Sequence, residues 1–450
     1  MSDLDALQAK GVCVSLFAYV SNRSALSFGG SCETTGVNVR PGGRVSELIE
    51  QRAHVAANCL LSGSESRELG KAEAMRLVFW QSILSQHQSS YIRALANRSG
   101  WDVTVVAERR MTPERAALGW SVPDFGQARL VIVSESPDAL AVEQYPQDAI
   151  HIMEGIRGFS MVRRVLPLLR KRSARGGIWF ESGDAVGLKG ALRRIVYTWH
   201  GLAHSTEIDF FLAMGTQAMD WYRKCHFPDA KLYPFAHVTE PTAGPIPKAN
   251  QPGRTGEVTV GFLGALIPRK GGDLLLRALA ALPNRNWRLI MVGEGESRPI
   301  WQRVAAHGRI SDHVTFTGVL PNTEAKAVLG HFDLFVLPSR FDGWGAVVNE
   351  ALMQGVPVLC SDRCGARDLL AEPWRGEVFK ADSVESLRDV LARWIDRGKR
   401  TPELTQRIKA WSRCIEGESV ADYFAAVLRH VYSGAPRPIA PWLRNGSAHD

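Results

Sequence analysis

The chain has 450 residues, of which 45% are hydrophobic and 22% are charged, and its formal net charge is +8. This length is enough for two hydrophobic cores of ordinary size, so we expect two domains. No apolar run is long enough for a membrane-spanning helix, and the amino terminus lacks the pattern of a secretory signal, which favours the cytosol. The seven cysteines have no paired CxxC spacing, which argues against a disulfide framework or a zinc site.

Residues 1–74 form an N-terminal extension with no sustained hydrophobic period. Two interpretations of this extension are compatible with the sequence: a disordered segment and an accessory segment. Because Met75 stands immediately before the first predicted strand, we hypothesise that translation or the functional domain begins there. Residues 75–240 then alternate short apolar runs with polar segments and include a helix predicted at 89–96, which indicates a first Rossmann-like domain. Its strands are predicted at 75–80, 101–106, 130–134, 149–153, 177–181 and 209–214.

Four prolines between residues 241 and 256 predict a linker, and a second series of strands and helices follows at 257–416. Its strands are predicted at 258–263, 287–292, 313–318, 333–337 and 357–361, with a helix at 272–282. This alternation is typical of a parallel, doubly wound sheet. Neither GxGxxG after a strand nor GxxxxGK[ST] occurs, which argues against dinucleotide oxidoreductases and P-loop NTPases. A terminal helix at 417–432 and a tail at 433–450 complete the chain.

The most informative segment, residues 338–352, joins a buried strand to a helix through a polar loop. Such a loop sits at the amino end of a helix, where unpaired N–H groups favour a phosphate. Asp342 and Glu350 lie eight positions apart on either side of two glycines. Since a carboxylate can contribute about 1.5–3 kcal/mol per charged hydrogen bond, vicinal hydroxyls of a ribose and a hexose are natural partners. An ordinary helix start, with Asp342 as its cap, is the alternative.

This segment resembles the donor-site signature of the family 4 glycosyltransferases, which are retaining enzymes of the GT-B fold. The signature is Glu, seven residues, Glu, and Asp342 stands in this chain at its first position and Glu350 at its second. Further matching blocks occur in order at 261–273, 289–295 and 314–318. The resemblance covers about residues 75–432 and implies two Rossmann-like doubly wound domains that face each other across a cleft.

The resemblance also implies roles for individual residues. Lys270 would contact the diphosphate of a nucleotide-diphosphate-sugar donor, Asp342 would orient the sugar, and Glu350 would hold the ribose. These three are the candidate catalytic residues, and no obligatory metal or other cofactor is expected because no Asp-x-Asp motif stands at a strand end. The expected donor-binding residues are Gly264, Arg269, Gly293, Gly343, Trp344 and Gly345.

Two positions depart from the family pattern. An Arg usually follows the glycine that corresponds to Gly264, whereas this chain has Ala265, and Arg269 could replace the missing charge from another backbone position. Asp342 is shorter than the usual Glu. These departures keep two alternatives open: a catalytically silent nucleotide-sugar-binding or scaffold protein, and another GT-B enzyme such as a hydrolase or epimerase.

The acceptor is expected in the first domain, where His87 and His151 are the candidate contact residues. The segment 157–194 is rich in Arg and Lys, and apolar residues interleave at 159–172, so an anionic membrane surface and a solvated basic helix face are both open. No nucleic-acid-binding module is recognisable. We predict a retaining glycosyltransferase of bacterial surface polysaccharide biosynthesis, cytosolic or peripheral on the inner face of the cytoplasmic membrane, with a glycan or lipid-linked acceptor.

Overall fold

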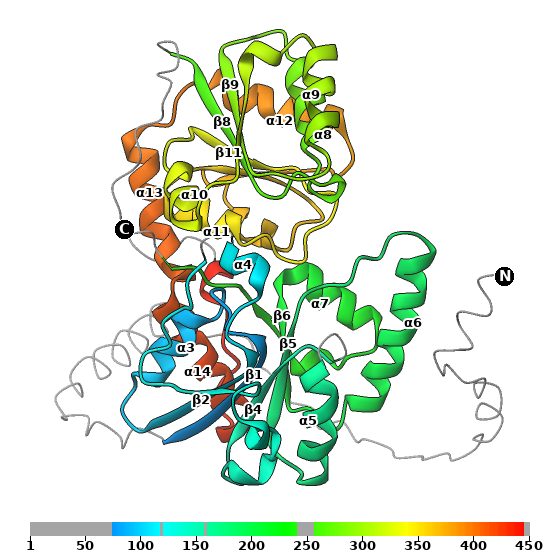
Figure 1. Ribbon diagram of the computed structural model, residues 1–450, viewed down its shortest axis with the longest axis vertical. Helices are drawn as coiled ribbons and strands as arrows, with labels where there is room; N and C mark the ends of the chain where they lie inside the picture. The colour runs from blue at the N-terminus through cyan, green and yellow to red at the C-terminus, as the bar shows by residue number, and fades with distance from the viewer. Residues whose placement is uncertain (1–73, 118–119, 157–159, 241–255, 445–450) are drawn as a thin grey trace, which may run out of the picture. The chain divides into compact units, whose positions relative to one another are not determined.

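The computed structural model describes residues 74–117, 120–156, 160–240 and 256–444. They belong to one compact unit, Gly70–Asp450, which contains two parallel β-sheets flanked by helices (Figure 1). The extension predicted at 1–74 lies outside the described residues except for its last residue. The linker residues 241–255, the end of the tail at 445–450, and Cys13, Cys32 and Cys59 also lie outside them.

The first sheet has seven parallel strands in the order β3-β2-β1-β4-β5-β6-β7. The predicted strands are confirmed, with ends that differ by at most three residues. Strand β7 was not predicted, because it is short and contains Pro234. The strand order reverses between β1 and β4, and such a switch point is where ligands bind in doubly wound sheets. The strands are β1 Met75–Ile83, β2 Trp101–Arg109, β3 Arg129–Ile132, β4 Ile150–Glu154, β5 Gly176–Phe180, β6 Phe210–Met214 and β7 Leu232–Phe235.

The second sheet has six parallel strands in the order β10-β9-β8-β11-β12-β13, with its switch point between β8 and β11. All five predicted strands are present, and none of their ends differs by more than one residue. The side chains of the central strands β8, β11 and β12 are almost all buried, as expected for strands that helices cover on both faces, whereas the edge strand β10 has no buried residue. The strands are β8 Val258–Leu263, β9 Trp287–Val292, β10 Val314–Gly318, β11 Leu334–Leu337, β12 Val358–Ser361 and β13 Gly376–Phe379.

Helices connect the strands and cover both sheets. In the second half, α8, α9 and α12 bury their apolar faces in one core cluster with the strands, while α11 and α13 contribute to another. The helices are α3 Ser89–Ala96, α4 Pro113–Ala117, α5 Ser160–Lys171, α6 Gly187–His204, α7 Gly215–Lys224, α8 Gly272–Ala280, α9 Arg298–His307, α10 Asn322–Leu329, α11 Val347–Met353, α12 Val384–Asp396, α13 Pro402–Ser412 and α14 Gly417–Ser433.

The last helix, α14, packs on the first sheet although it follows the second in sequence (Figure 1). The ring of Phe424 lies 6.3 Å from the ring of Phe79 on β1 and 5.9 Å from that of Phe235 on β7. Asp422 forms an ion pair with Arg98 at the end of α3. The chain therefore returns to its first sheet, which ties the two halves of the unit together.

The structure corrects the interpretation of residues 159–172 as a segment whose apolar side chains could meet a membrane. Pro167 lies inside α5 and does not end it. The apolar residues of α5 pack into a core cluster with β1, β4 and β5, and only Pro167 and Leu168 stay exposed. The buried residues of α5 are Met161, Val162, Val165, Leu166 and Leu169. Among the described residues, no helix is both long and apolar enough to cross a membrane.

Candidate active site

A cavity of about 600 Å³ lies where the carboxyl ends of the two sheets meet. Its walls come from the segments that follow β1, β2, β5 and β7 in the first sheet, and from those that follow β8, β9, β10 and β11 in the second. The switch point between β8 and β11 therefore opens into this cavity, and the segment after β1 reaches it from the switch point of the first sheet, in agreement with the general rule for doubly wound sheets. The volume is in the range of small-molecule sites.

Lys270 and Asp342 form the central ion pair of the second half. Lys270 Nζ lies 2.5 Å from Asp342 Oδ2, and the hydroxyl of Ser339 donates to the same oxygen at 3.2 Å. Both charged side chains are largely buried, so their interaction is little screened by solvent. Arg269, which is about half exposed, lies 3.8 Å from Asp342 Oδ1 and also lines the cavity. Two cations thus face the cavity, and one carboxylate fixes the position of Lys270.

Two glycines bring the backbone close to these side chains. Gly293 has φ +134°, and a Cβ there would lie 2.0 Å from the carbonyl oxygen of Gly264. Gly345 has φ +94°, and its Cβ would lie 2.8 Å from Cys364 Sγ. A side chain at either position would be strained and would clash. The loops after β8, β9 and β11 can therefore converge on the cavity only with glycine at these sites.

Glu350 lies on α11, and its carboxylate is 3.7 Å from Lys326 Nζ on α10. Burial raises the pKa of Glu350 above its usual value, and the charge of Lys326 acts in the opposite direction. Both side chains are largely buried, and Glu350 lines the cavity. Glu350 can accept hydrogen bonds from a ligand's hydroxyls there. Lys326 could not be predicted, because nothing in the sequence pattern of α10 distinguishes it from a surface lysine.

Trp344 and Gly343 position the loop after β11. The indole of Trp344 donates to Asn349 Oδ1 at 2.8 Å, and Asn349 Nδ2 donates to the carbonyl oxygen of His237 at 2.9 Å. This chain of bonds joins the loop after β11 to the segment after β7. A Cβ on Gly343 would lie only 2.0 Å from Glu181 Oε2, so the absence of a side chain allows Glu181 to approach.

The first half contributes a carboxylate and two histidines. Glu181, directly after β5, lies 2.8 Å from His237 Nε2, and the rings of His237 and His87 are 5.4 Å apart. Burial opposes the ionisation of Glu181, but the bond to His237 and the charges of His237, Arg269 and Lys270 outweigh it and hold its pKa below the usual value. Burial lowers the pKa of His87 well below 6.5, and the charge of His237 adds to this. The Nδ1 atoms of both rings have no hydrogen-bond partner among the described residues.

Of these residues, His87 was predicted, whereas Glu181 and His237 were missed. The available signal for Glu181 was its place at the end of a predicted strand. His237 follows a strand that was not predicted, so no sequence signal marked it.

The prediction that His151 faces the cleft is wrong. His151 is the second residue of β4, away from its carboxyl end, and it is almost completely buried. Trp80 Nε1 donates to its Nδ1 at 3.1 Å, and burial lowers its pKa to about 4. The residue at the carboxyl end of β4 is Glu154, which accepts from the backbone N–H and the hydroxyl of Ser82 at 2.7 and 2.9 Å.

Part of the chain is similar in sequence to known glycosyltransferases. Residues 247–411 match the family model of glycosyl transferases group 1. The chain is 34% identical over 151 residues to the GDP-mannose-dependent alpha-(1-6)-phosphatidylinositol monomannoside mannosyltransferase of Mycobacterium tuberculosis, a match covering 31% of this chain and 39% of that protein. It is 32% identical over 143 residues to the 2-deoxystreptamine glucosyltransferase of Streptomyces kanamyceticus, covering 31% and 37%. The matches span about two fifths of the length of these relatives.

Solved structures match over a larger part of the chain. Anabaena HepE in complex with UDP is similar with a TM-score of 0.60 at 14% identity, covering 79% of this chain and 99% of that one. Sucrose-phosphate synthase from Thermosynechococcus elongatus is similar with a TM-score of 0.58 at 18% identity, covering 80% and 100%. These likenesses show the fold and confirm the predicted GT-B architecture. The family match is thus confined to residues 247–411, whereas the fold match extends over about four fifths of the chain.

Proposed function

We propose that the protein is a retaining glycosyltransferase of family 4 that moves a sugar from a nucleotide-diphosphate sugar to a glycan or lipid-linked acceptor. The observation that carries this proposal is the single cavity in which Lys270, Arg269 and Glu350 face Glu181 and His237. The mannosyltransferase of M. tuberculosis is named for a GDP-mannose donor, and the Anabaena structure contains UDP. Both agree with a nucleotide-sugar donor here.

In the proposed reaction, Lys270 and Arg269 bind the donor diphosphate. The leaving diphosphate gains negative charge as the glycosidic bond breaks, so two cations fixed beside it stabilise the transition state more than the bound donor. Asp342 holds Lys270 in place through their 2.5 Å contact. Arg269 supplies the charge that the family's usual Arg would give at Ala265, and both residues line the cavity.

Glu350 accepts hydrogen bonds from the two ribose hydroxyls of the donor. This role needs an ionised carboxylate, and burial works against ionisation. Lys326, 3.7 Å away, offsets that penalty. Because the ribose does not take part in bond breaking, its contacts contribute to donor binding in the ground state and in the transition state alike.

Same-face attack of the acceptor suits this site better than a double displacement through Asp342. Asp342 already interacts with Lys270, Ser339 and Arg269, so it is not a free nucleophile. In same-face attack, the departing phosphate oxygen takes the proton of the acceptor hydroxyl. Glu181, held by His237, contacts hydroxyls of the transferred sugar or of the acceptor from the other side of the cavity.

We assign the reaction to surface polysaccharide biosynthesis at the inner face of the cytoplasmic membrane, because the resembled family includes enzymes with lipid-linked acceptors. We also propose that no divalent cation is required, since Lys270 and Arg269 supply the positive charge. Transfer that continues unchanged in EDTA would support this, and transfer that is lost in EDTA and restored by a metal would contradict it.

The test is turnover of UDP-, GDP- and ADP-sugars with and without membrane lipid extract. The parent is compared with Glu350→Ala and Asp342→Ala, and with Glu385→Ala, which removes an exposed carboxylate of α12, as the control. We expect nucleotide release that depends on the extract, falls in the two site variants and persists in the control. The anomeric configuration of the product, read by NMR, tests retention.

Other outcomes would point to the alternatives. Release that does not depend on any acceptor would indicate a hydrolase. A nucleotide that binds and raises the melting temperature without any release would indicate a silent binding protein.

A further inference from the structure

Helix α6, Gly187–His204, carries an apolar stripe that faces solvent. Its five members are between 60% and 86% exposed, and every other helix among the described residues has at most one exposed large hydrophobic side chain. The stripe is not a continuation of the buried core, because none of its members belongs to a core cluster. The α6 stripe consists of Leu188, Leu192, Ile195, Trp199 and Leu202.

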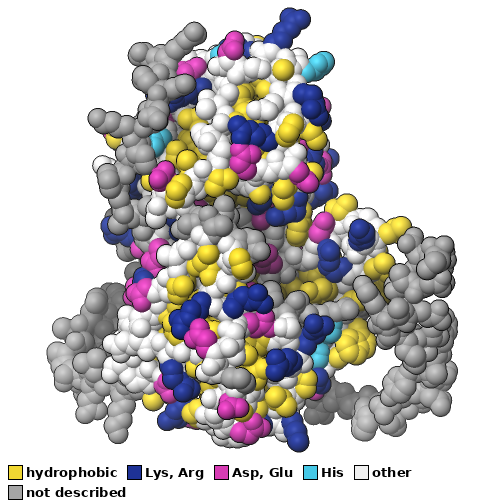
Figure 2. All heavy atoms as spheres, viewed as in Figure 1, with side chains coloured by type: hydrophobic (Ala, Val, Ile, Leu, Met, Phe, Trp, Pro, Cys, Tyr) yellow, Lys and Arg dark blue, Asp and Glu magenta, His cyan; other side chains and the backbone are white. Residues whose placement is uncertain are grey.

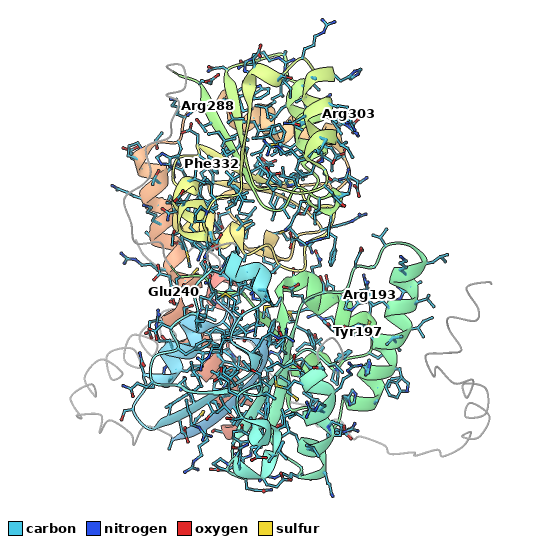
Figure 3. The ribbon with its side chains drawn as sticks, viewed as in Figure 1. Arg193, Tyr197, Glu240, Arg288, Arg303 and Phe332 are labelled. Atoms are coloured by element: carbon cyan, nitrogen blue, oxygen red, sulfur yellow. The ribbon has the colours of Figure 1, made fainter. Side chains whose placement is uncertain are left out.

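The stripe lies opposite the face that anchors α6 to the protein. Its members follow each other at intervals of four, three, four and three residues, which places them along one side of a helix. On the opposite side, the ring of Tyr197 lies 6.3 Å from that of Trp221 and 5.8 Å from that of Tyr222, both on α7. Gly201 is buried there, and a Cβ on it would lie 2.2 Å from the carbonyl oxygen of Cys225. Figure 3 shows Tyr197 pointing from α6 toward the body of the protein. The stripe therefore points outward.

Basic residues accompany the stripe without any acidic ones. Residues 187–204 contain Lys189, Arg193 and Arg194 but no Asp or Glu. Among the described residues, none of the three forms an ion pair, and Arg193 donates to the backbone oxygen of Asp184. Figure 2 shows yellow and dark blue side chains next to each other at the right of the view, where α6 lies in Figure 1. At about 100° per residue, Lys189 and Arg194 lie on opposite flanks of the stripe.

A second copy of the chain is a poor occupant of this surface. Pairing two α6 helices would bring six cations together with no carboxylate from the helices between them. The stripe spans only two heptads, and five side chains give much less area than the roughly 1,200–2,000 Å² of a stable interface. An anionic lipid bilayer, by contrast, matches both features, since lipid phosphates attract the flanking cations and the boundary of the acyl chains accepts the apolar side chains.

We propose that α6 docks the protein on an anionic lipid bilayer, with the α6 stripe inserted at the boundary between headgroups and acyl chains and with Lys189 and Arg194 at the lipid phosphates. Trp199 suits this depth because its ring is apolar and its N–H is polar. The apolar part of this surface differs from the one that the sequence suggested at 159–172, since the apolar side chains of α5 are buried. Its cations Lys189 and Arg194 belong to the predicted basic segment 157–194. The proposal does not rest on the sugar transfer proposed above.

The test is co-sedimentation of the full chain with vesicles of phosphatidylcholine alone and of phosphatidylcholine with 30% phosphatidylglycerol. We expect the parent to bind the anionic vesicles. Leu192→Gln combined with Trp199→Gln should weaken partitioning at least about tenfold, because the apolar area is lost. Lys189→Gln combined with Arg194→Gln should weaken it by about fivefold per charge, and added salt should mimic this effect. The control, Ile300→Gln combined with Ile439→Gln, removes two exposed apolar side chains outside α6 and should bind like the parent.

Several results would overturn the proposal. They are a parent that does not bind anionic vesicles, a stripe variant that binds as well as the parent, and a concentration-dependent dimer that dissociates when the stripe is changed. An unchanged melting temperature of each variant shows that the fold is intact. Quenching by brominated lipids provides a second readout, since the quenched signal should be smaller in Trp199→Phe than in the parent. Equal quenching in the two would contradict insertion of Trp199.

Discussion

The two halves of the cavity are built in different ways. In the second half, the loops after β8, β9 and β11 converge through glycines whose backbone angles or close contacts exclude side chains, as at Gly293 and Gly345. In the first half, Glu181 and His237 meet across 56 positions on strand ends that have no such backbone requirement. Residue types in the second half are therefore constrained by backbone geometry, whereas Glu181 and His237 in the first half are constrained by their contact with each other. We expect the proposed donor side to tolerate fewer substitutions than the proposed acceptor side.

The largest effect is expected from Lys270→Ala. Removing a fixed cation beside a leaving group typically costs 10²- to 10³-fold in turnover, and we expect a loss of that order in kcat/KM. The change also leaves Asp342 buried without its closest partner, so the melting temperature should fall. Steady-state kinetics and thermal unfolding in the presence of the donor measure the two effects.

Arg269→Ala is the matched control for that variant. Its side chain is 48% exposed, against 16% for Lys270, so solvent screens its charge and we expect a loss of only about tenfold. Equal losses in the two variants would show that the buried ion pair has no special role on the donor side.

Glu350→Gln should act on binding rather than on bond breaking. We expect the KM for the donor to rise about 10- to 100-fold with little change in kcat, because contacts to the ribose are the same before and during the reaction. Burial raises the pKa of Glu350, so a falling pH protonates it earlier than an ordinary glutamate. The KM of the parent should therefore increase as the pH falls through this raised pKa.

The pH profile of the Glu350→Gln variant provides the control, since Gln does not titrate. Its KM should change less with pH than that of the parent. A fall in kcat with an unchanged KM would instead indicate that Glu350 contacts the reacting part of the donor.

Gly343→Ala tests whether the two halves must approach each other closely. The new Cβ would lie 2.0 Å from Glu181 Oε2, so Glu181 has to move, and we expect about a tenfold loss of kcat/KM with a small change in stability. Combining Gly343→Ala with Glu181→Gly should cost no more than Glu181→Gly alone, because the carboxylate and the Cβ of Glu181, which would lie 2.0 and 2.9 Å from the new Cβ, are then absent. Additive losses in this cycle would show that Gly343 matters for another reason.

The difference between the halves also explains what the sequence could predict. The strands and the donor loop were predictable because buried parallel strands are continuous apolar runs and because the loops need glycine at fixed places. The sequence could not predict the roles of Lys326, Glu181 and His237. These roles depend on which helix or strand end lies across the cavity, and no local hydrophobic period in the sequence encodes that arrangement. The short strand β7 contains Pro234, so the segment that positions His237 gave no strand signal.

The smallest effect on activity is expected for His151→Gln, in the half where the sequence suggested a contact with the acceptor. Because His151 does not line the cavity, kcat/KM should stay within about twofold of the parent. Gln can accept the hydrogen bond from Trp80 Nε1 in place of the ring nitrogen. A tenfold loss of kcat/KM with unchanged stability would contradict this and return His151 to the acceptor site.

The pH dependence of the unfolding free energy should nevertheless reveal the burial of His151. Burial lowers its pKa in the folded protein to about 4, whereas an unfolded histidine titrates near 6.5. Acidification therefore protonates the unfolded state first, so the stability that neutral His151 contributes is complete above pH 6.5 and is lost as the pH falls toward 4. Between pH 7 and pH 5 the parent should lose about 2 kcal/mol more unfolding free energy than His151→Gln. Denaturant unfolding of both proteins at the two pH values measures this difference, in which the contributions of His87 and His204 cancel.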